Sequence, residues 1–242
     1  VQHTGSDRHP GPPVLADPSD PFSSPAVRGG REDDFNEAEV TFFRGSVLVS
    51  PNDELDIGVS YFSQTTEAEG RNEHNPFFGG GEDYVSYKGY ADPQESSIDL
   101  LNMDVEVDLG FAMLTSATGY SEVETDGTSE SSGFLRTNIP QYYFGFPRLF
   151  APIERSQQVD TFTQELRLVS QTEGPVDWIV GAYYLERDTD FTINQLAFGL
   201  NDYTNNYLGL NPSIDFGDTL ATGILDSTFE DIAFFGEVTW HI

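Results

Sequence analysis

The sequence contains no cysteine and only 11 basic residues against 41 acidic ones. The absence of cysteine excludes a disulfide scaffold, thiolate nucleophiles and thiolate metal sites. A net charge of −30 excludes a nucleic-acid-binding protein, which needs basic side chains opposite the phosphates. No run of about 18 apolar residues occurs, which excludes a transmembrane helix. Residues 1–10 also lack the apolar core of a signal peptide.

Aromatic residues are plentiful, with 19 Phe, 11 Tyr and 2 Trp. They argue against the disorder that such a high net charge would otherwise suggest, because disordered chains contain few aromatic side chains. Most of them lie in short runs beside β-branched residues, which is typical of strands. Helical periodicity is nearly absent. The sequence therefore predicts an all-β fold.

Apolar and polar residues alternate in seven stretches that we interpret as strands. Their expected bounds are 38–50, 55–67, 98–108, 111–123, 158–169, 177–190 and 229–242. The alternation is clearest in the third strand, where one face holds Leu101, Met103, Val105 and Val107 and the other holds Asn102, Asp104 and Glu106. The strand at 177–190 is apolar on both faces, so its facing stays open.

Short and long gaps alternate between these strands. The short turns are 51–54, 108–110 and 170–176, and the long connections are 68–97, 124–157 and 191–228. Long structureless loops are uncommon in compact soluble domains, whereas transmembrane β-barrels have short periplasmic turns and long extracellular loops. We therefore predict that 38–242 form an antiparallel up-and-down meander within such a barrel, and that 1–37 are an irregular extracellular segment. The alternative is a soluble β-sandwich.

Three local strings carry a resemblance to a known family. They are LTSATGY at 114–120, the hairpin from TFTQELRLVS to AYYLERDTD at 161–190, and FFGEVTW at 234–240. Together they resemble strands of TonB-dependent receptors from the outer membrane of Gram-negative bacteria. The resemblance implies a receptor that imports a scarce nutrient with energy from the TonB complex. A ferric siderophore or similar iron chelate is its most frequent cargo, and cobalamin and oligosaccharides are less frequent.

The sequence also departs from that family. Family members carry an N-terminal plug with a TonB-coupling segment, which we do not recognise here, and their barrels have about 22 strands. We therefore expect an internal fragment of the barrel that starts in an extracellular loop and ends near a periplasmic turn. The implied partners are TonB through the absent plug, the cargo, and outer-membrane lipid with lipopolysaccharide. A secreted or surface adhesion sandwich and a passive porin remain alternatives.

Aromatic residues suggest two kinds of functional position. Those near strand ends fit the girdles that such barrels place at the membrane interfaces: Tyr61, Phe62, Tyr120, Tyr183, Tyr184 and Trp240. Those in the long loops, with two arginines, are candidate ligand-binding residues: Phe77, Phe78, Tyr84, Tyr87, Tyr90, Tyr142, Tyr143, Phe144, Phe146, Arg136 and Arg148. Alternatively, the loop aromatics pack against one another and hold the loops over the barrel.

Catalytic motifs are missing from the sequence. There is no HExxH, no phosphate-binding glycine loop and no nucleophile elbow. We therefore predict that the chain is not an enzyme and has no cofactor and no metal site. The acidic loops either bind divalent cations that bridge to lipopolysaccharide or are simply solvated.

Overall fold

A computed structural model describes residues 6–7, 32–33, 36–70, 92–131, 151–171, 174–209 and 219–241. Seven long strands form one sheet: β3 (Ala38–Asn52), β4 (Leu55–Ala68), β5 (Gln94–Asp108), β6 (Ala112–Glu130), β7 (Pro152–Ser170), β8 (Val176–Leu196) and β9 (Thr219–Trp240). Two short strands, β1 (Ser6–Asp7) and β2 (Glu32–Asp33), pair with each other. A short α2 (Leu200–Asp202) and a π-helical turn η2 (Tyr203–Tyr207) complete the described elements.

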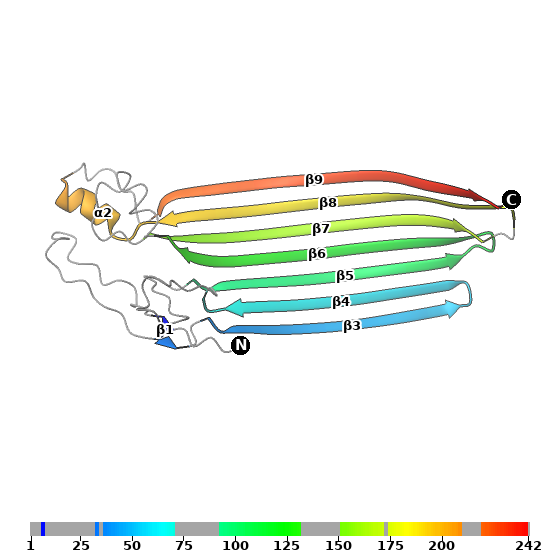
Figure 1. The fold of residues 1–242 in the computed structure, drawn as a ribbon, viewed down its shortest axis with the longest axis horizontal. Coiled ribbons are helices and arrows are strands. Elements are labelled where there is room, and N and C mark those ends of the chain that lie inside the picture. The colour runs from blue at the N-terminus through cyan, green and yellow to red at the C-terminus, as the bar shows by residue number, and fades with distance from the viewer. Residues whose placement is uncertain are drawn as a thin grey trace.

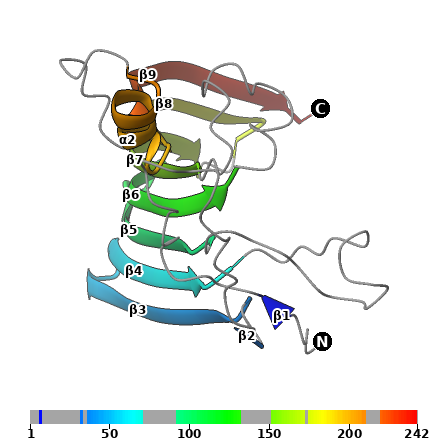
Figure 2. The same ribbon diagram turned by 90° about the vertical axis from the view of Figure 1, so that its left-hand side faces the viewer.

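The seven strands lie in chain order, and each pairs antiparallel with its neighbours in sequence. Figure 1 shows them side by side, with β1 and α2 at one end, which we call the loop end. The tight turns lie at the opposite, turn end. This confirms the predicted all-β class and the up-and-down order of the seven strands. The sheet is open, with β3 and β9 at its two edges, and Figure 2 shows it almost along the strands.

The strands are longer than predicted, and nearly all of the extra length lies toward the loop end. For example, β6 continues to Glu130 and β9 begins at Thr219, whereas the sequence predicted bounds of 123 and 229. The connections are accordingly shorter than predicted, at 69–93, 131–151 and 197–218. The segments added to β5 and β6, 94–97 and 124–130, are polar, so hydrophobic alternation did not reveal them. Those added to β8 and β9 also contain apolar residues, such as Phe191, Ile193 and Ile224, which the predicted bounds left out. The backbone ladder continues through them because it depends on amide pairing rather than on side-chain polarity.

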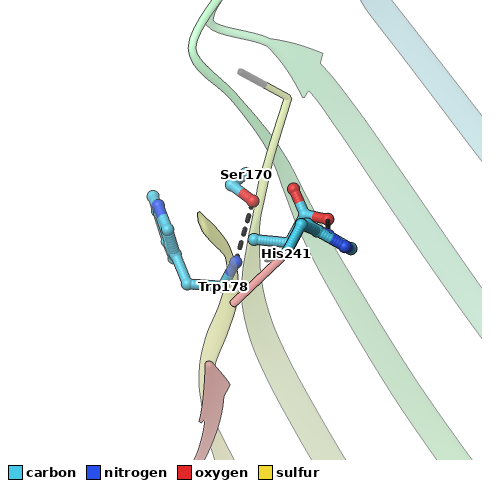
Figure 3. A network of polar contacts seen from close by, with 4 residues as sticks. Ser170, Trp178 and His241 are labelled. Carbon is cyan, nitrogen blue, oxygen red and sulfur yellow. Dashed lines mark hydrogen bonds and ion pairs between the residues drawn. The ribbon is translucent and has the colours of Figure 1, made fainter. Parts of the chain in front are cut away.

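The three predicted short turns are confirmed, and a side chain fixes each of them. In the first, the Glu54 amide donates to Asn52 Oδ1 at 2.9 Å. The Gly110 amide donates to Asp108 Oδ1 at 2.7 Å, and Gly110 has φ of 80°, a conformation that favours glycine. In the β7–β8 turn, the Trp178 amide donates to Ser170 Oγ at 2.9 Å (Figure 3). His241 lies beside this turn, and its Nε2 is 2.5 Å from Asp177 Oδ2.

The connection between β8 and β9 contains structure that the sequence analysis missed. It was predicted to be a long loop, but α2 and η2 fold there. Leu200 and Tyr203 pack with Ala151 and Ala197 into a small buried cluster at the loop end. Two helical turns are too short to show periodicity, so the prediction of a structureless connection was wrong here.

The large sheet is a single layer. Within the described part of the chain, the other sheet is only the β1–β2 pair, and many large apolar side chains on the strands stay exposed, including Phe234 at 83%. No described helix is long and apolar enough to cross a membrane. The strands therefore leave apolar surface that no second layer of described structure covers.

Candidate functional site

The register of the sheet assigns every strand residue to one of two faces, because successive side chains point to opposite sides. We call the side of Met103 face A and the side of Asn102 face B. Met103 lies opposite Val59 on β4 and Thr118 on β6, which therefore share face A. The face assignments predicted from alternation in β5 are confirmed. The facing of β8, left open by the sequence, is settled by its neighbours: Ala182 lies opposite Leu166 and shares face A.

The turn-end half of face A is an apolar band. It runs across all seven strands and holds no charged residue on any of them. Its apolar members are Val47, Val49, Leu55, Ile57, Val59, Met103, Val105, Val107, Leu114, Leu166, Leu168, Val176, Trp178, Val180, Ala182, Ile232, Phe234, Val238 and Trp240. A band of this extent is far larger than the apolar patches that soluble monomers expose.

Away from the β7–β8 turn, three polar side chains interrupt the band, and they satisfy one another. The Thr118 hydroxyl donates to Gln164 Oε1 at 2.7 Å, and Gln164 Nε2 donates to Ser116 Oγ at 3.0 Å and to the Glu165 carbonyl at 3.0 Å. Mutual pairing matters most where water cannot supply the missing partner. The band is therefore chemically suited to a medium without water.

Tyrosines mark the edge of the band toward the loop end. Tyr61 and Tyr120 flank Leu101 in one cross-strand row, which continues through Phe162 to Glu186; we call it the boundary row. The Tyr120 hydroxyl donates to Asp160 Oδ1 at 2.9 Å, one level nearer the loop end. Tyr61 donates to Asp99 in the same way, and Tyr184, one level below the row, donates to Glu186 Oε2 at 2.5 Å. Each ring thus lies on the apolar side with its hydroxyl toward a carboxylate.

Carboxylates change face at this boundary row. From the row to the loop end, every Asp and Glu of the described strands lies on face A: Glu39, Glu67, Glu95, Asp99, Glu122, Glu124, Asp126, Glu130, Glu154, Asp160, Glu186, Asp188, Asp190, Asp226 and Glu230. Between the row and the turn end they all lie on face B: Asp56, Asp104, Glu106, Asp108, Glu165, Asp177, Asp231 and Glu237. The sequence analysis missed this exchange.

The arginines of the described strands lie on face B without exception: Arg44, Arg155, Arg167 and Arg187. Arg167 lies in the turn-end half, where its Nη1 is 3.9 Å from Glu165 Oε1. The two residues are two apart on β7 and therefore lie on the same face. Both side chains are more than one-third exposed, so the pair contributes little to stability.

The six aromatic residues of the predicted girdle do not share one face of the sheet. Tyr61, Tyr120 and Tyr184 lie at the edge of the apolar band, and Trp240 lies in it at the turn end. Phe62 and Tyr183, however, are on face B. Each is the immediate neighbour of a face A tyrosine, and adjacent residues of a strand point to opposite sides. Placing both members of each pair in one girdle was therefore wrong.

The predicted ligand-binding residues lie in 71–91 and 132–150, outside the residues that the structure describes. Among the described residues, no group of three or more His, Asp or Glu is arranged to hold a metal ion. A shallow groove of about 280 Å³ lies near the loop end, and Asp126, Glu154 and Thr192 are among its lining residues.

Comparison with known proteins leaves the chain without an assigned family. The sequence matches no protein-family model, and no curated protein matches it either. We therefore infer the function from the two faces of the sheet and from the strings that resemble receptor strands.

Proposed function

We propose that this chain forms part of a β-barrel in the bacterial outer membrane, and that the barrel belongs to a receptor of the TonB-dependent kind. The receptor takes up a scarce nutrient, with an iron chelate such as a ferric siderophore as the cargo, using energy delivered by TonB. The function is transport and not catalysis. The apolar band on face A carries the proposal.

The band has the dimensions of an outer-membrane span. It follows β8 from Val176 to Tyr184, which at about 3.3 Å per residue and a strand tilt of about 40° is roughly 20 Å of height. Barrels of this class have an outward apolar band about 25 Å tall, edged by aromatic girdles. Lipid would cover the band, and the tyrosine hydroxyls at the boundary row would reach the polar interface.

The exchange of carboxylates between the faces supports the same arrangement. On the turn-end side of the boundary row, face A would contact lipid while the carboxylates of face B lie in a wet interior. On the loop-end side, the strands would extend beyond the membrane, so face A meets water and can be acidic. A soluble sandwich keeps one face of each strand in its core along the whole length, and such a strand has no reason to exchange faces midway.

The direction of the edge strands limits how the barrel closes. Both β3 and β9 run from the loop end to the turn end. A fully antiparallel barrel that contains this sheet therefore needs an odd number of further strands between them. A second copy in the same orientation cannot supply them, because both seams would then be parallel. The proposed receptor supplies the missing strands from outside 38–242, and its plug would carry the contact with TonB.

The resemblance of 114–120, 161–190 and 234–240 to receptor strands supports the transport part of the proposal. A passive porin would share the band but not the plug or the coupling to TonB. The aromatic residues of the long loops and the two loop arginines Arg136 and Arg148 remain the proposed cargo contacts, because loops at the outer opening meet the cargo first.

Tryptophan fluorescence tests the central claim. The two tryptophans, Trp178 and Trp240, are both replaced by Phe, and a single Trp is introduced at Val105 on face A or at Asp104 on face B. The full chain is then placed in micelles of a neutral detergent brominated on its alkyl chain, which quenches adjacent indole rings. We expect strong quenching of Val105→Trp and weak quenching of its neighbour Asp104→Trp.

Equal quenching at the two positions would contradict the assignment of face A to lipid. The transport claim needs a second measurement in cells. Deletion of the whole gene from its host should abolish growth on the cognate ferric chelate as sole iron source, and a copy lacking TonB coupling should not restore it. Growth that persists without the gene would contradict iron import while leaving the membrane assignment intact.

A further inference from the structure

The loop-end half of face B contains arginines but no carboxylate. It begins with the cross-strand row that joins Arg44, Phe62, Leu100, Ser121, Thr161, Arg187 and Phe229. Arg155 lies on the same face nearer the loop end, opposite Gly127. We call these face B residues, from the row to the loop end, the cationic half-face. The nearest carboxylate below it on the same face is Asp231, one level toward the turn end.

The two arginines of this row have no counterion in the described structure. No hydrogen bond or ion pair joins Arg44 or Arg187 to another described residue, and both side chains are exposed. Arg155 differs, because its Nη1 donates to Ser129 Oγ at 2.6 Å. In a chain with a net charge of −30, carboxylates were available to pair with these guanidinium groups, yet in the loop-end half of the sheet they all lie on the other face.

Rings and hydroxyls surround the free guanidinium groups. Arg187 has Thr161 directly opposite on β7 and Phe229 directly opposite on β9. Arg44 lies opposite Phe62. A guanidinium presents several N–H donors in one plane, which suits a carboxylate, sulfonate or phenolate. A ring beside it offers an apolar face to the rest of the same ligand.

We propose that the cationic half-face binds small anionic molecules that have an aromatic or aliphatic body. Arg187 on β8 and Arg44 on β3 are separated by four strands, so each forms a site of its own. At each site the guanidinium contacts the anionic group, and the ring opposite it, Phe229 or Phe62, packs against the body. In the proposed receptor this half-face lines the inside of the outer part of the barrel, so the cargo is an anion. That last step rests on the proposed function, whereas the binding itself depends only on the sheet.

A matched pair of probes tests whether the site prefers a negative or a positive charge on the ligand. The full chain is dispersed in micelles of a neutral detergent, its strand content is checked by circular dichroism, and binding is measured by equilibrium dialysis against empty micelles. The probes are 2-naphthalenesulfonate and a naphthalene of the same size that carries a trimethylammonium group. We expect tighter binding of the sulfonate, although the net charge of the chain favours the cation.

Variants then locate the site. Arg187→Gln and Arg44→Gln should each remove about half of the sulfonate bound at low probe concentration, and the double variant should weaken binding about tenfold. Arg187→Lys should lose less than Arg187→Gln. The control is Arg167→Gln, an arginine of the same face outside the cationic half-face, which should bind like the parent chain. Any of three results overturns the proposal: tighter binding of the cation, no sulfonate binding beyond that of empty micelles, or unchanged sulfonate binding in both Arg187→Gln and Arg44→Gln.

The outcome separates this proposal from the one on which its cargo step rests. If Val105→Trp is quenched by brominated detergent but the sulfonate does not bind, the membrane assignment stands and the anion site fails. If the sulfonate binds through Arg187 but face A avoids detergent, the anion site stands and the barrel fails.

Discussion

Tyr120 on β6 donates its hydroxyl to Asp160 on β7 at 2.9 Å, at the level where face A changes from apolar to acidic. The pair joins a ring in the boundary row to a carboxylate one level nearer the loop end. Tyr61 and Asp99 repeat the arrangement two strands away. The same tyrosine–carboxylate pairing on two separate strand pairs marks one boundary across the sheet. In the proposed barrel, the lipid ends at this boundary.

The first prediction compares neighbouring residues of β5. Replacing Val105 by Arg puts a charge in the middle of the apolar band, where an arginine facing lipid costs about 2–4 kcal/mol of folding free energy. Replacing Asp104 by Arg changes a charge on face B, which is wet in the proposed barrel, and should be nearly neutral. Urea unfolding of the assembled barrel in lipid vesicles measures both. If Asp104→Arg is the more damaging change, the assignment of the faces is reversed.

The second prediction concerns the three polar side chains within the band. Thr118→Val removes the donor to Gln164 Oε1 and leaves that oxygen unsatisfied among apolar neighbours, at a cost of about 1–3 kcal/mol. In a chain that already carries Gln164→Leu, the same change should cost much less, because no amide is left to satisfy. The four free energies of unfolding form a double-mutant cycle. A coupling near zero would show that the pair adds nothing to stability.

The third prediction follows from a close contact on face B. A Cβ at Gly181 would overlap the Phe235 ring on β9, so Gly181→Ala should destabilise the sheet by about 1–3 kcal/mol through overpacking. The loss should largely disappear in a chain that carries Phe235→Ala. Gly58→Ala is the control, because its nearest contact would be 3.9 Å away. Thermal unfolding followed by circular dichroism measures the stability of the parent chain, the three single variants and the double variant.

The order and type of the strands could be predicted from the sequence because each turn-end segment repeats a simple pattern. Leu101, Met103 and Val105 alternate with Asn102 and Asp104, and such a period of two is specific for a strand with two different environments. The turns carried local signals too, such as Asp108 before Gly110. These features depend on residues close together in the chain, which a single sequence displays directly.

The exchange of faces depends on register, which a single sequence does not display. The alternation of Ala182 and Tyr184 continues through Glu186, Asp188 and Asp190, which therefore lie on the same face. Because the strand has apolar residues on both sides, the sequence did not show which of its residues belong to face A. The spacing of these carboxylates, two residues apart, was a usable signal that the sequence analysis did not use. The small cluster around Leu200 and Tyr203 was beyond reach, because it joins short segments that are distant in sequence.

The last prediction concerns the chain by itself in water. The apolar band would be exposed, and the edges of β3 and β9 would each present a row of unpaired backbone groups. Long exposed edges pair with other chains, and an apolar surface of this size associates. We therefore expect residues 1–242 to aggregate in plain buffer and to disperse when detergent covers the band. Stable insertion into a membrane should require the strands that close the barrel. Size-exclusion chromatography with light scattering measures the mass of the particles with and without detergent. A sharp monomer peak near 26.8 kDa in plain buffer, with cooperative thermal unfolding, would show that the band is covered within the chain itself, and a soluble β protein would then replace the barrel.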